Sequence, residues 1–350
     1  MPFKVGIIGV GRKGMTIDDE TRWLLNYDEL PCSHASAYAA NEETQVAAIA
    51  NPGEDAFQDF RRRYGEVATY RDAREMLERE KLDIVSVVTH AHLHAEMTIA
   101  AAESGVKGII CEKAMATSLE ECDAMIEACR ANNVKLLVNH PRRFHPMFQI
   151  AKEQIQNGAI GEVKLAQCTG YGKLMHNGSH TFDVLRDFFG DAAWVQGELV
   201  ETDDPADPDG RGLVQMKNGV AAFVDFASVQ PFGFTFSGID GQIVIDQWDE
   251  GLELNNYELQ DQRPGRPWFS YSSKRAVRRR FHAPQRHLPP MQAAVAELVA
   301  AIQEDRAPII SGEDGRAALE LGLAMHASAH QDGARVPIPF EDKSLRVVSR

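Results

Sequence analysis

Three groups of residues in this chain have the types and spacing that chemistry on a bound nucleotide needs. A Gly-x-Gly-x-x-Gly turn, Gly9–Gly14, closes the first apolar run of the sequence. Glu112 and Lys113 close a later apolar run, and His176 and His180 follow further along. The turn predicts a place for a dinucleotide pyrophosphate, and the lysine predicts chemistry beside a nicotinamide. In this order, the two signals indicate a hydride-transfer enzyme.

Each glycine of the turn has a separate mechanical role. Gly9 permits the tight strand-to-helix turn, Gly11 lets the backbone approach the pyrophosphate, and Gly14 allows close helix packing. Amides at the helix N-terminus then favour the phosphate charge. The segment Thr16–Ser33 intervenes before the expected helix, Ser36–Asn41. We interpret it as an insertion near the cofactor that forms a lid or a dimer contact, or else a surface excursion.

Asn51 ends the second predicted strand, where an acid normally binds the ribose hydroxyls. Asn51 can still hydrogen-bond these hydroxyls, but it does not repel a 2′-phosphate. Glu54 and Asp55 follow it, and no Arg or Lys comes directly after. These residues favour NAD and leave NADP open.

His90, His92 and His94 follow another predicted strand at alternate positions. An extended chain would aim all three at one face, as a set of metal ligands requires. The alternative is that His94 begins a helix while the preceding loop lines the nicotinamide pocket. Because the segment holds no partnered carboxylate, we predict no metal.

Lys113 is expected to donate a hydrogen bond to a substrate oxygen near the hydride-transfer centre. If this stretch stood alone, we would interpret Lys113 as a solvated lysine at the end of a strand. A helix that begins near Gly178 would place His180 in its first turns, with His176 just before it. His180 then suits a general base that takes the hydroxyl proton as hydride leaves the carbon.

Strands and helices that can position these residues alternate over residues 1–138. Apolar strands are predicted at Phe3–Val10, Gln45–Ala50, Leu82–Val88, Val106–Cys111 and Val134–Val138. Helices are predicted at Glu54–Tyr64, Asp72–Glu80, His94–Ser104 and Ser118–Asn132, the last with a capping box of Ser118 and Glu121. This alternation predicts an α/β domain, a Rossmann-type doubly wound parallel sheet.

The pattern changes in residues 139–350. A helix at Pro146–Asn157 precedes longer strands at Glu162–Gly172, Ala193–Glu201, Gly212–Met216, Val220–Ser228 and Phe234–Asp246, and helices at Met291–Asp305 and Gly312–Gln331 follow. We predict an α+β domain with a large open, mainly antiparallel sheet. The basic run Arg275–Arg280 is interpreted as a solvated loop or an intersubunit salt-bridge patch, with a site for an anionic substrate group as the alternative.

Composition fits an ordinary globular protein, with 44% hydrophobic and 25% charged residues over 350 positions. The net charge of -14 disfavours a general nucleic-acid binder. No apolar run approaches the roughly 20 residues of a membrane span, and the N-terminus leaves no room for a signal peptide. Five scattered cysteines suit reduced thiols, so we expect a cytoplasmic protein.

As a set, these residues resemble the glucose–fructose oxidoreductase / inositol dehydrogenase / MocA family over nearly the whole chain. The matching motifs are Gly9-x-Gly11-x-x-Gly14, Thr89–His94, Glu112-Lys113, Arg142–Pro146, Gly158–Val163, Gly178–Asp183 and Ser311–Gly315. The resemblance implies a Rossmann domain, then an open-sheet domain that often serves for dimerisation, and NAD(P)-linked oxidation of a sugar or polyol or the reverse reduction. It places the catalytic lysine on Lys113 and the catalytic histidine on His180.

The chain departs from the family pattern at three places. The usual Glu-Lys-Pro reads Glu112-Lys113-Ala114, and Thr-Pro-x-x-x-His reads Thr89–His94 without its proline. The acid four residues before His180 is replaced by His176, which brings no fixed negative charge.

The resulting site prediction assigns catalysis to Lys113, His180 and His176. The predicted cofactor-binding residues are Gly9, Gly11, Arg12, Gly14, Asn51, Thr89, His90, His94, Glu112 and Lys113. The predicted substrate contacts are Lys113, Arg142, Arg143, His176, Asn177 and His180, although the two arginines can instead pair with acidic neighbours. The expected partners are a small sugar or polyol and further copies of the chain, as a homodimer or homotetramer through the C-terminal sheet. An NAD-dependent glycosidase that uses transient oxidation, and a non-catalytic NAD- and sugar-responsive protein, are the alternatives.

Overall fold

The computed structural model describes residues 1–22, 30–200, 202, 206–228, 232–246, 251–259, 274–282 and 287–347. The chain divides into two compact units. The first contains Met1–Phe144, Leu288–Leu323 and Glu341–Arg350, and the second contains His145–His287 and Ala324–Phe340. The first unit therefore extends past the predicted boundary at residue 138 and includes two later segments of the chain.

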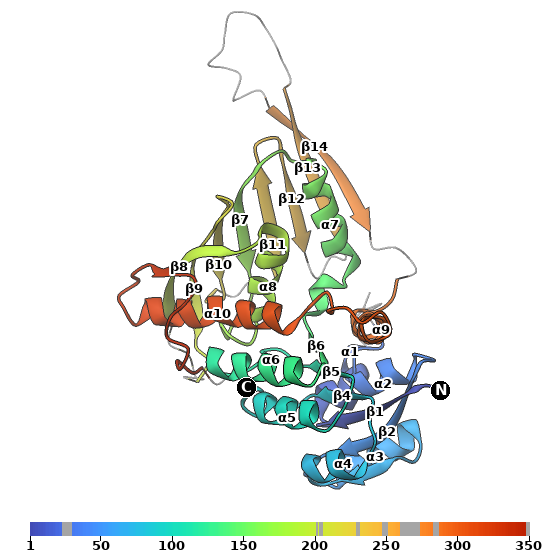
Figure 1. Cartoon of the computed structure of the whole chain (residues 1–350). Helices are drawn as coiled ribbons and strands as arrows, with labels where there is room; N and C mark the ends of the chain where they lie inside the picture. Colours follow the sequence, from blue (N-terminus) through green and yellow to red (C-terminus); the bar gives the residue numbers. More distant parts are fainter. Residues whose placement is uncertain are drawn as a thin grey trace, which may run out of the picture. The chain divides into compact units, whose positions relative to one another are not determined.

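A parallel sheet forms the centre of the first unit (Figure 1). Its strands within the described ranges are β1 (Phe3–Ile8), β2 (Thr44–Ala50), β3 (Ala68–Tyr70), β4 (Ile84–Val87), β5 (Gly108–Cys111) and β6 (Lys135–Val138), in the order β3-β2-β1-β4-β5-β6. The order reverses beside β1, as in a doubly wound sheet whose ligands bind at the carboxyl ends of the strands. The predicted α/β Rossmann fold is confirmed.

Helices cover both faces of this sheet. The two faces are built from η1 (Arg12–Thr16), α1 (Ile17–Thr21), α2 (His34–Ala39), α3 (Asp55–Tyr64), α4 (Ala73–Arg79), α5 (Ala91–Glu103), α6 (Leu119–Ala131) and α9 (Pro290–Gln303), with the short η2 (Pro141–Arg143) after β6. The buried apolar cluster joins α2, α3 and α9 to the sheet. A side chain at Gly108 would collide with Leu298 and Ile302 of α9. This close packing explains why a late helix belongs to the first unit.

A mainly antiparallel sheet forms the second unit. Its strands within the described ranges are β7 (Val163–Thr169), β8 (Ala192–Val200), β9 (Asp209–Met216), β10 (Ala221–Asp225), β11 (Gly233–Gly238), β12 (Gly241–Asp246), β13 (Gly251–Leu259), β14 (Lys274–His282) and β15 (Val336–Pro337). Their order is β14-β13-β12-β11-β7-β10-β9-β8-β15, and the β7–β10 pair is parallel. The predicted open, mainly antiparallel sheet is confirmed.

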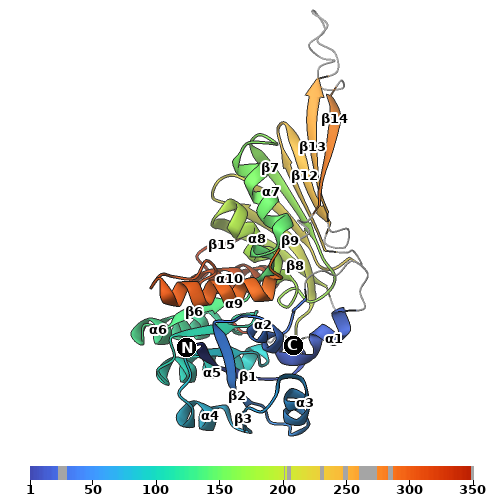
Figure 2. The same cartoon turned by 90° about the vertical axis from the view of Figure 1, so that its right-hand side faces the viewer.

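One face of the second sheet is covered by helices. These are α7 (Pro146–Gln156), α8 (Gly178–Phe189) and the C-terminal part of α10 (Gly312–Ala329), and Figure 2 shows α7 and α8 on the same side of the sheet. Phe148 of α7 packs against Phe234, and Phe189 of α8 packs against Phe236. The opposite face presents Leu165, Leu213, Phe223 and Tyr257, each between 37% and 40% exposed.

Several predicted elements differ in detail. Helix α2 begins at His34 rather than Ser36, and α5 begins at Ala91 rather than His94 because the His90 carbonyl already accepts a hydrogen bond from the Leu93 amide at 2.9 Å. Strands β3, β13, β14 and β15 were not predicted. The loop interpretation of Arg275–Arg280 is wrong, because this run lies in β14 and pairs with β13.

The capping box predicted for α6 is half formed. The Ser118 hydroxyl accepts a hydrogen bond from the Glu121 amide at 3.2 Å. The Glu121 carboxylate instead accepts hydrogen bonds from the amide and the hydroxyl of Thr117. The helix is thus capped as expected on one side, and the reciprocal contact moves one residue towards the N-terminus.

Within the described ranges, the structure contains no helix that combines the length and the apolar character needed to cross a bilayer. The five cysteines are buried thiols.

Candidate active site

The glycine turn after β1 leaves a place for a pyrophosphate. Gly9 has a φ of +93°, and a side chain there would lie 2.6 Å from the Val88 carbonyl oxygen. A side chain at Gly14 would collide with the Gly9 carbonyl. Gly11 is exposed and has no neighbouring atom within 4 Å of an added Cβ. Gly9 thus makes the tight turn, Gly14 allows close packing and Gly11 leaves the backbone open to a ligand, as predicted. The turn therefore fits a dinucleotide.

Arg12 and Asn51 flank this turn. The Arg12 guanidinium pairs with the Glu20 carboxylate, with the Nε–Oε2 distance at 2.8 Å. The Asn51 amide bridges two loops, because its oxygen accepts a hydrogen bond from the Val10 amide at 3.4 Å and its nitrogen donates to the Gly53 carbonyl at 3.1 Å. Asn51 therefore joins the end of β2 to the glycine turn.

Beyond Asn51, the Glu54 carboxylate forms an ion pair with the Arg71 guanidinium. Arg71 directly follows β3, and the Tyr70 carbonyl at the end of that strand accepts a hydrogen bond from the backbone amide of Asn51. Arg71, which is 20 residues from Asn51 in the sequence, thus lies near the end of β2, where the Glu54 carboxylate neutralises its charge.

The Thr89–His94 segment leads from β4 into α5, and its His94 ring bridges the turns that follow β4 and β5. The His94 ring is buried in α5, with Nδ1 at 2.9 Å from the Ala114 carbonyl oxygen and Nε2 at 3.0 Å from the Thr89 carbonyl oxygen. Burial lowers the pKa of His94, which favours the neutral ring. The segment is helical from Ala91, so His90, His92 and His94 do not share one face of an extended chain. No cluster with metal-ligand geometry occurs among the described residues.

Glu112 and Lys113 form the turn after β5. The Glu112 carboxylate is buried and accepts hydrogen bonds from the Asn139 side-chain amide at 2.7 Å and from the Lys113 backbone amide at 3.3 Å. Lys113 is half-buried, and its peptide bond to Ala114 is cis. A carboxylate held from several sides thus lies directly beside the predicted catalytic lysine.

The two predicted arginines after β6 lie in different surroundings. Arg142 is buried. Arg143 pairs with Asp314 at 3.2 Å and donates to the Ile309 carbonyl at 3.2 Å. For Arg143, the acidic neighbour proposed as the alternative partner is therefore present within the first unit.

The loop before α8 carries the predicted histidines of the second unit. Helix α8 begins at Gly178 as predicted, so His180 lies in its first turn and His176 precedes it. The Asp207 carboxylate accepts hydrogen bonds from the backbone amides of Met175 at 2.8 Å and of His176 at 2.9 Å. The loop that presents the histidines is therefore held by a buried acid.

Asn177 and Asp209 complete this loop. The Asn177 side-chain amide donates to the carbonyls of Tyr171 at 2.7 Å and Gly172 at 3.0 Å. The Asp209 carboxylate accepts a hydrogen bond from the Lys173 amide at 2.6 Å. Asn177, predicted to bind substrate, thus also stabilises the loop that contains it.

Comparison with known proteins relates the chain to a family of oxidoreductases. Residues 3–140 match the family model described as "Oxidoreductase family, NAD-binding Rossmann fold". The chain is 24% identical over 354 residues to the myo-inositol 2-dehydrogenase of Thermotoga maritima, which covers 94% of this chain and 97% of that protein. Residues 3–140 thus match the glucose–fructose oxidoreductase / inositol dehydrogenase / MocA family, and the whole chain is similar to a sugar-alcohol dehydrogenase. The chain is an oxidoreductase with an NAD-binding Rossmann domain.

Further relatives of this oxidoreductase show the same fold. A 36% identical match to the levoglucosan dehydrogenase of Pseudarthrobacter phenanthrenivorans spans 161 residues, 46% of this chain and 39% of that protein. The solved structure of a levoglucosan dehydrogenase with NADH has a TM-score of 0.79 at 22% identity, over 97% of this chain and 100% of that one. The aldose-aldose oxidoreductase of Caulobacter crescentus with glycerol has a TM-score of 0.77, with the same identity and coverage.

Two residues of this oxidoreductase were missed in the sequence. Asp207 lies in a stretch rich in Pro and Asp that carries no recognisable motif, and its backbone partners are about 30 residues away in the chain. His34 contacts Glu112 from α2 at 3.0 Å. The local sequence indicates only where α2 begins, because Ser33 caps this helix by accepting a hydrogen bond from the Ser36 amide. His34 is the first residue of the helix.

Proposed function

We propose that this oxidoreductase transfers a hydride between a sugar or polyol carbon and NAD, with Lys113 and His180 acting on the same hydroxyl. One observation carries the proposal. The glycine turn follows β1 and Lys113 follows β5, and β4 alone separates these strands in the sheet. Both turns therefore lie at the same carboxyl edge, about 10 Å apart for two strand spacings. A dinucleotide at the turn brings its reactive end within reach of Lys113.

The proposed chemistry assigns one task to each residue. The Lys113 ammonium donates a hydrogen bond to the substrate oxygen and stabilises the charge that develops there. The neutral His180 imidazole accepts the hydroxyl proton, the C–O bond becomes a carbonyl, and the C–H electron pair leaves as hydride. When bound, the nicotinamide supplies the hydride acceptor.

The remaining site residues are proposed as binding groups. Cofactor contacts are assigned to Gly9, Gly11, Arg12, Gly14, Asn51, Thr89, His90, His94, Glu112 and Lys113. Substrate contacts beyond the catalytic pair are assigned to His176, Asn177, Arg142 and Arg143. The local partners of Asn177 and Arg143 support a role in which they also hold the site in place. The names of the relatives, inositol and levoglucosan dehydrogenases, support a carbohydrate-like alcohol as substrate.

A turnover assay tests the reaction class. We expect the full chain to form NADH, seen as absorbance at the nicotinamide band, from NAD and at least one member of a panel of polyols and aldoses. Thermal-shift measurements with NAD alone should raise the melting temperature, because a ligand at a hundred times its Kd stabilises by about 2.7 kcal/mol. Stabilisation by NAD and sugars without turnover of any panel member would contradict the proposed dehydrogenase.

Cofactor choice is expected to depend on Glu54. Its carboxylate neutralises Arg71 and adds negative charge where a 2′-phosphate would lie. Glu54→Gln removes this charge and releases Arg71, so we expect the ratio of NADP to NAD efficiency, as kcat/KM, to rise about tenfold, or about 1.4 kcal/mol. Glu66→Gln is the matched control, because exposed Glu66 pairs with Arg61 instead. An unchanged ratio in Glu54→Gln would remove Glu54 from cofactor selection.

We also propose that the chain forms a homodimer or homotetramer in the cytoplasm. The exposed apolar side chains on the uncovered face of the second sheet, Leu165, Leu213, Phe223 and Tyr257, support an interface there. Five buried thiols support a reducing compartment.

A further inference from the structure

A buried polar cluster connects α2 to the turn that carries Lys113. We call it the His34 cluster, and its members are His34, Tyr38, Ser86, Glu112 and Asn139. The His34 ring is fully buried, with Nδ1 at 2.9 Å from the Ser86 hydroxyl and Nε2 at 3.0 Å from Glu112 Oε1. The Tyr38 hydroxyl lies 2.8 Å from the same Ser86 hydroxyl. The cluster thus joins α2 and β4 to the turns that follow β5 and β6.

A neutral imidazole satisfies every contact of His34. The Tyr38 hydroxyl donates to Ser86, the Ser86 hydroxyl donates to Nδ1, and the Nε2 proton of His34 goes to Glu112. Each hydroxyl then donates once and no donor faces another. A fully satisfied buried network of this kind fixes the positions of its members.

Glu112 is the end of this chain and the link to Lys113. Burial opposes its ionisation, yet the hydrogen bond from His34, the charge of Lys13 and the hydrogen bond from Asn139 hold its pKa below the usual value. Its second oxygen accepts the backbone amide of Lys113. The ionisable groups near Glu112 are His34 on α2, Lys13 on η1, His94 on α5, and Cys111 and Lys113 on either side of it in the chain.

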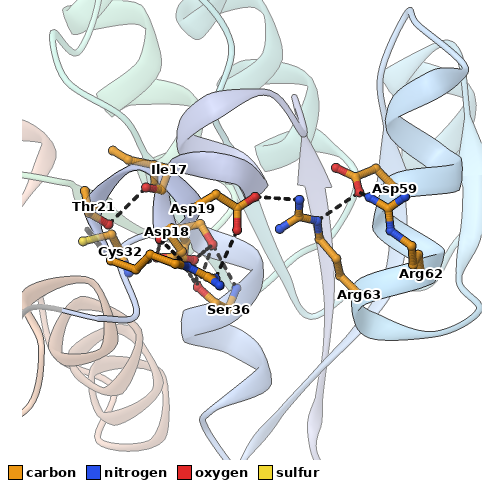
Figure 3. A network of polar contacts seen from close by, with 11 residues as sticks. Ile17, Asp18, Asp19, Thr21, Cys32, Ser36, Asp59, Arg62 and Arg63 are labelled. Atoms are coloured by element: carbon orange, nitrogen blue, oxygen red, sulfur yellow. Dashed lines mark hydrogen bonds and ion pairs between the residues drawn. The ribbon is translucent and has the colours of Figure 1, made fainter. Parts of the chain in front are cut away.

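The base of the Thr16–Ser33 insertion determines where α2 begins. The buried Asp18 carboxylate accepts hydrogen bonds from the amides of Cys32 at 2.6 Å and Ser33 at 3.2 Å, and from the hydroxyls of Ser33 at 2.6 Å and Ser36 at 2.5 Å. Figure 3 shows Asp18 between α1 and the start of α2, facing Cys32 and Ser36, whereas Asp19 points towards Arg63. Asp18 thus fastens the start of the helix whose first residue is His34.

We propose that His34 is a positioning residue for Lys113, and that Asp18 holds His34 in place at the base of the insertion. The inference rests on the proposed role of Lys113. Asp18 contacts the start of α2, His34 on this helix contacts Glu112, and Glu112 accepts a hydrogen bond from the Lys113 amide. Without the Nε2 donor, only the Asn139 amide and the Lys113 backbone amide hold the Glu112 carboxylate, so its position beside the lysine turn is less well fixed. Small displacements of a reacting group have large effects on rate.

The histidine is tested by a pair of variants at one position. His34→Leu removes both polar contacts, whereas His34→Gln keeps one amide donor that can reach Glu112 in place of Nε2. We expect His34→Leu to lower kcat about tenfold or more, with the Kd for NAD changed less than twofold. His34→Gln should recover most of kcat, because its amide restores a donor to Glu112.

Two outcomes would overturn the proposal. One is wild-type kcat in His34→Leu. The other is an equal loss of kcat in both His34 variants together with an equal loss of thermal stability, which a merely structural role predicts.

If His34→Leu does not fold, variants of Asp18 and Asp19 provide the test. Asp18→Ala should lower kcat with the Kd for NAD changed less than twofold, whereas Asp19→Ala, whose carboxylate pairs with Arg22 and Arg63, should leave kcat unchanged. Equal kcat in the two aspartate variants would contradict the link to the insertion. A Lys113→Ala variant with unchanged turnover would instead remove the proposed function, whatever the His34 variants do.

Discussion

Lys113→Ala is expected to lower kcat about a hundredfold or more while the enzyme still binds NAD. The lysine ammonium is the group proposed to face the substrate oxygen, and loss of one such donor typically costs 10²–10³ in rate. The turn itself should persist, because Glu112 accepts a hydrogen bond from the backbone amide of residue 113, which the variant keeps. The measurement is kcat and KM by NADH formation, with NAD affinity from fluorescence titration.

A second lysine near the same strand provides the control. Lys107 precedes β5 and pairs with Asp83 at 2.8 Å, with more than half of its side chain exposed. Lys107→Ala should leave kcat unchanged, because an exposed pair contributes little even to stability. Partial recovery of Lys113→Ala by an added primary amine would identify the ammonium group as the active element. Wild-type kcat in Lys113→Ala would rule out the assigned chemistry.

The sequence predicted the parallel sheet well because buried parallel strands are short apolar runs that end in glycine or a polar residue. Five of the six strands in the first unit were located to within a few residues. Strand β3 was missed because Ala68, Thr69 and Tyr70 make only a three-residue edge strand. Strand β14 was missed because its charges, including Arg278 and Arg280, suggest a solvated segment, although charged residues also commonly protect an edge strand.

The site was predicted only in part, for a physical reason. Residues such as Gly9 and Lys113 can be recognised in the sequence, because each lies at the end of a predicted strand and belongs to a local motif. The partners that hold them come from remote positions. His34 and Glu112 are 78 residues apart, and nothing in the spacing connects them. The start of α2 was also hard to predict, because Asp18 holds its capping residue Ser33 from 15 residues earlier in the chain.

His180→Ala is expected to lower kcat by 10²–10⁴, the range typical of a removed general base. In the wild-type enzyme only the neutral imidazole can accept the hydroxyl proton, so alcohol oxidation should rise with pH as a histidine loses its proton, ordinarily near about 6.5. His180→Ala should lose that limb and show a larger primary deuterium isotope effect with substrate labelled at the carbinol carbon, because the chemical step becomes more nearly rate-limiting.

The second unit provides the control histidine. His330 is exposed near the end of α10, and His330→Ala should retain both kcat and the pH profile. Because Asp207 holds the loop through the backbone amides of Met175 and His176, the loop should keep its position in His180→Ala. Loss of rate with an unchanged melting temperature would then report the imidazole itself. Retention of the wild-type pH limb in His180→Ala would assign the base to another group, and His176, four residues earlier where the family has an acid, would be the first to replace.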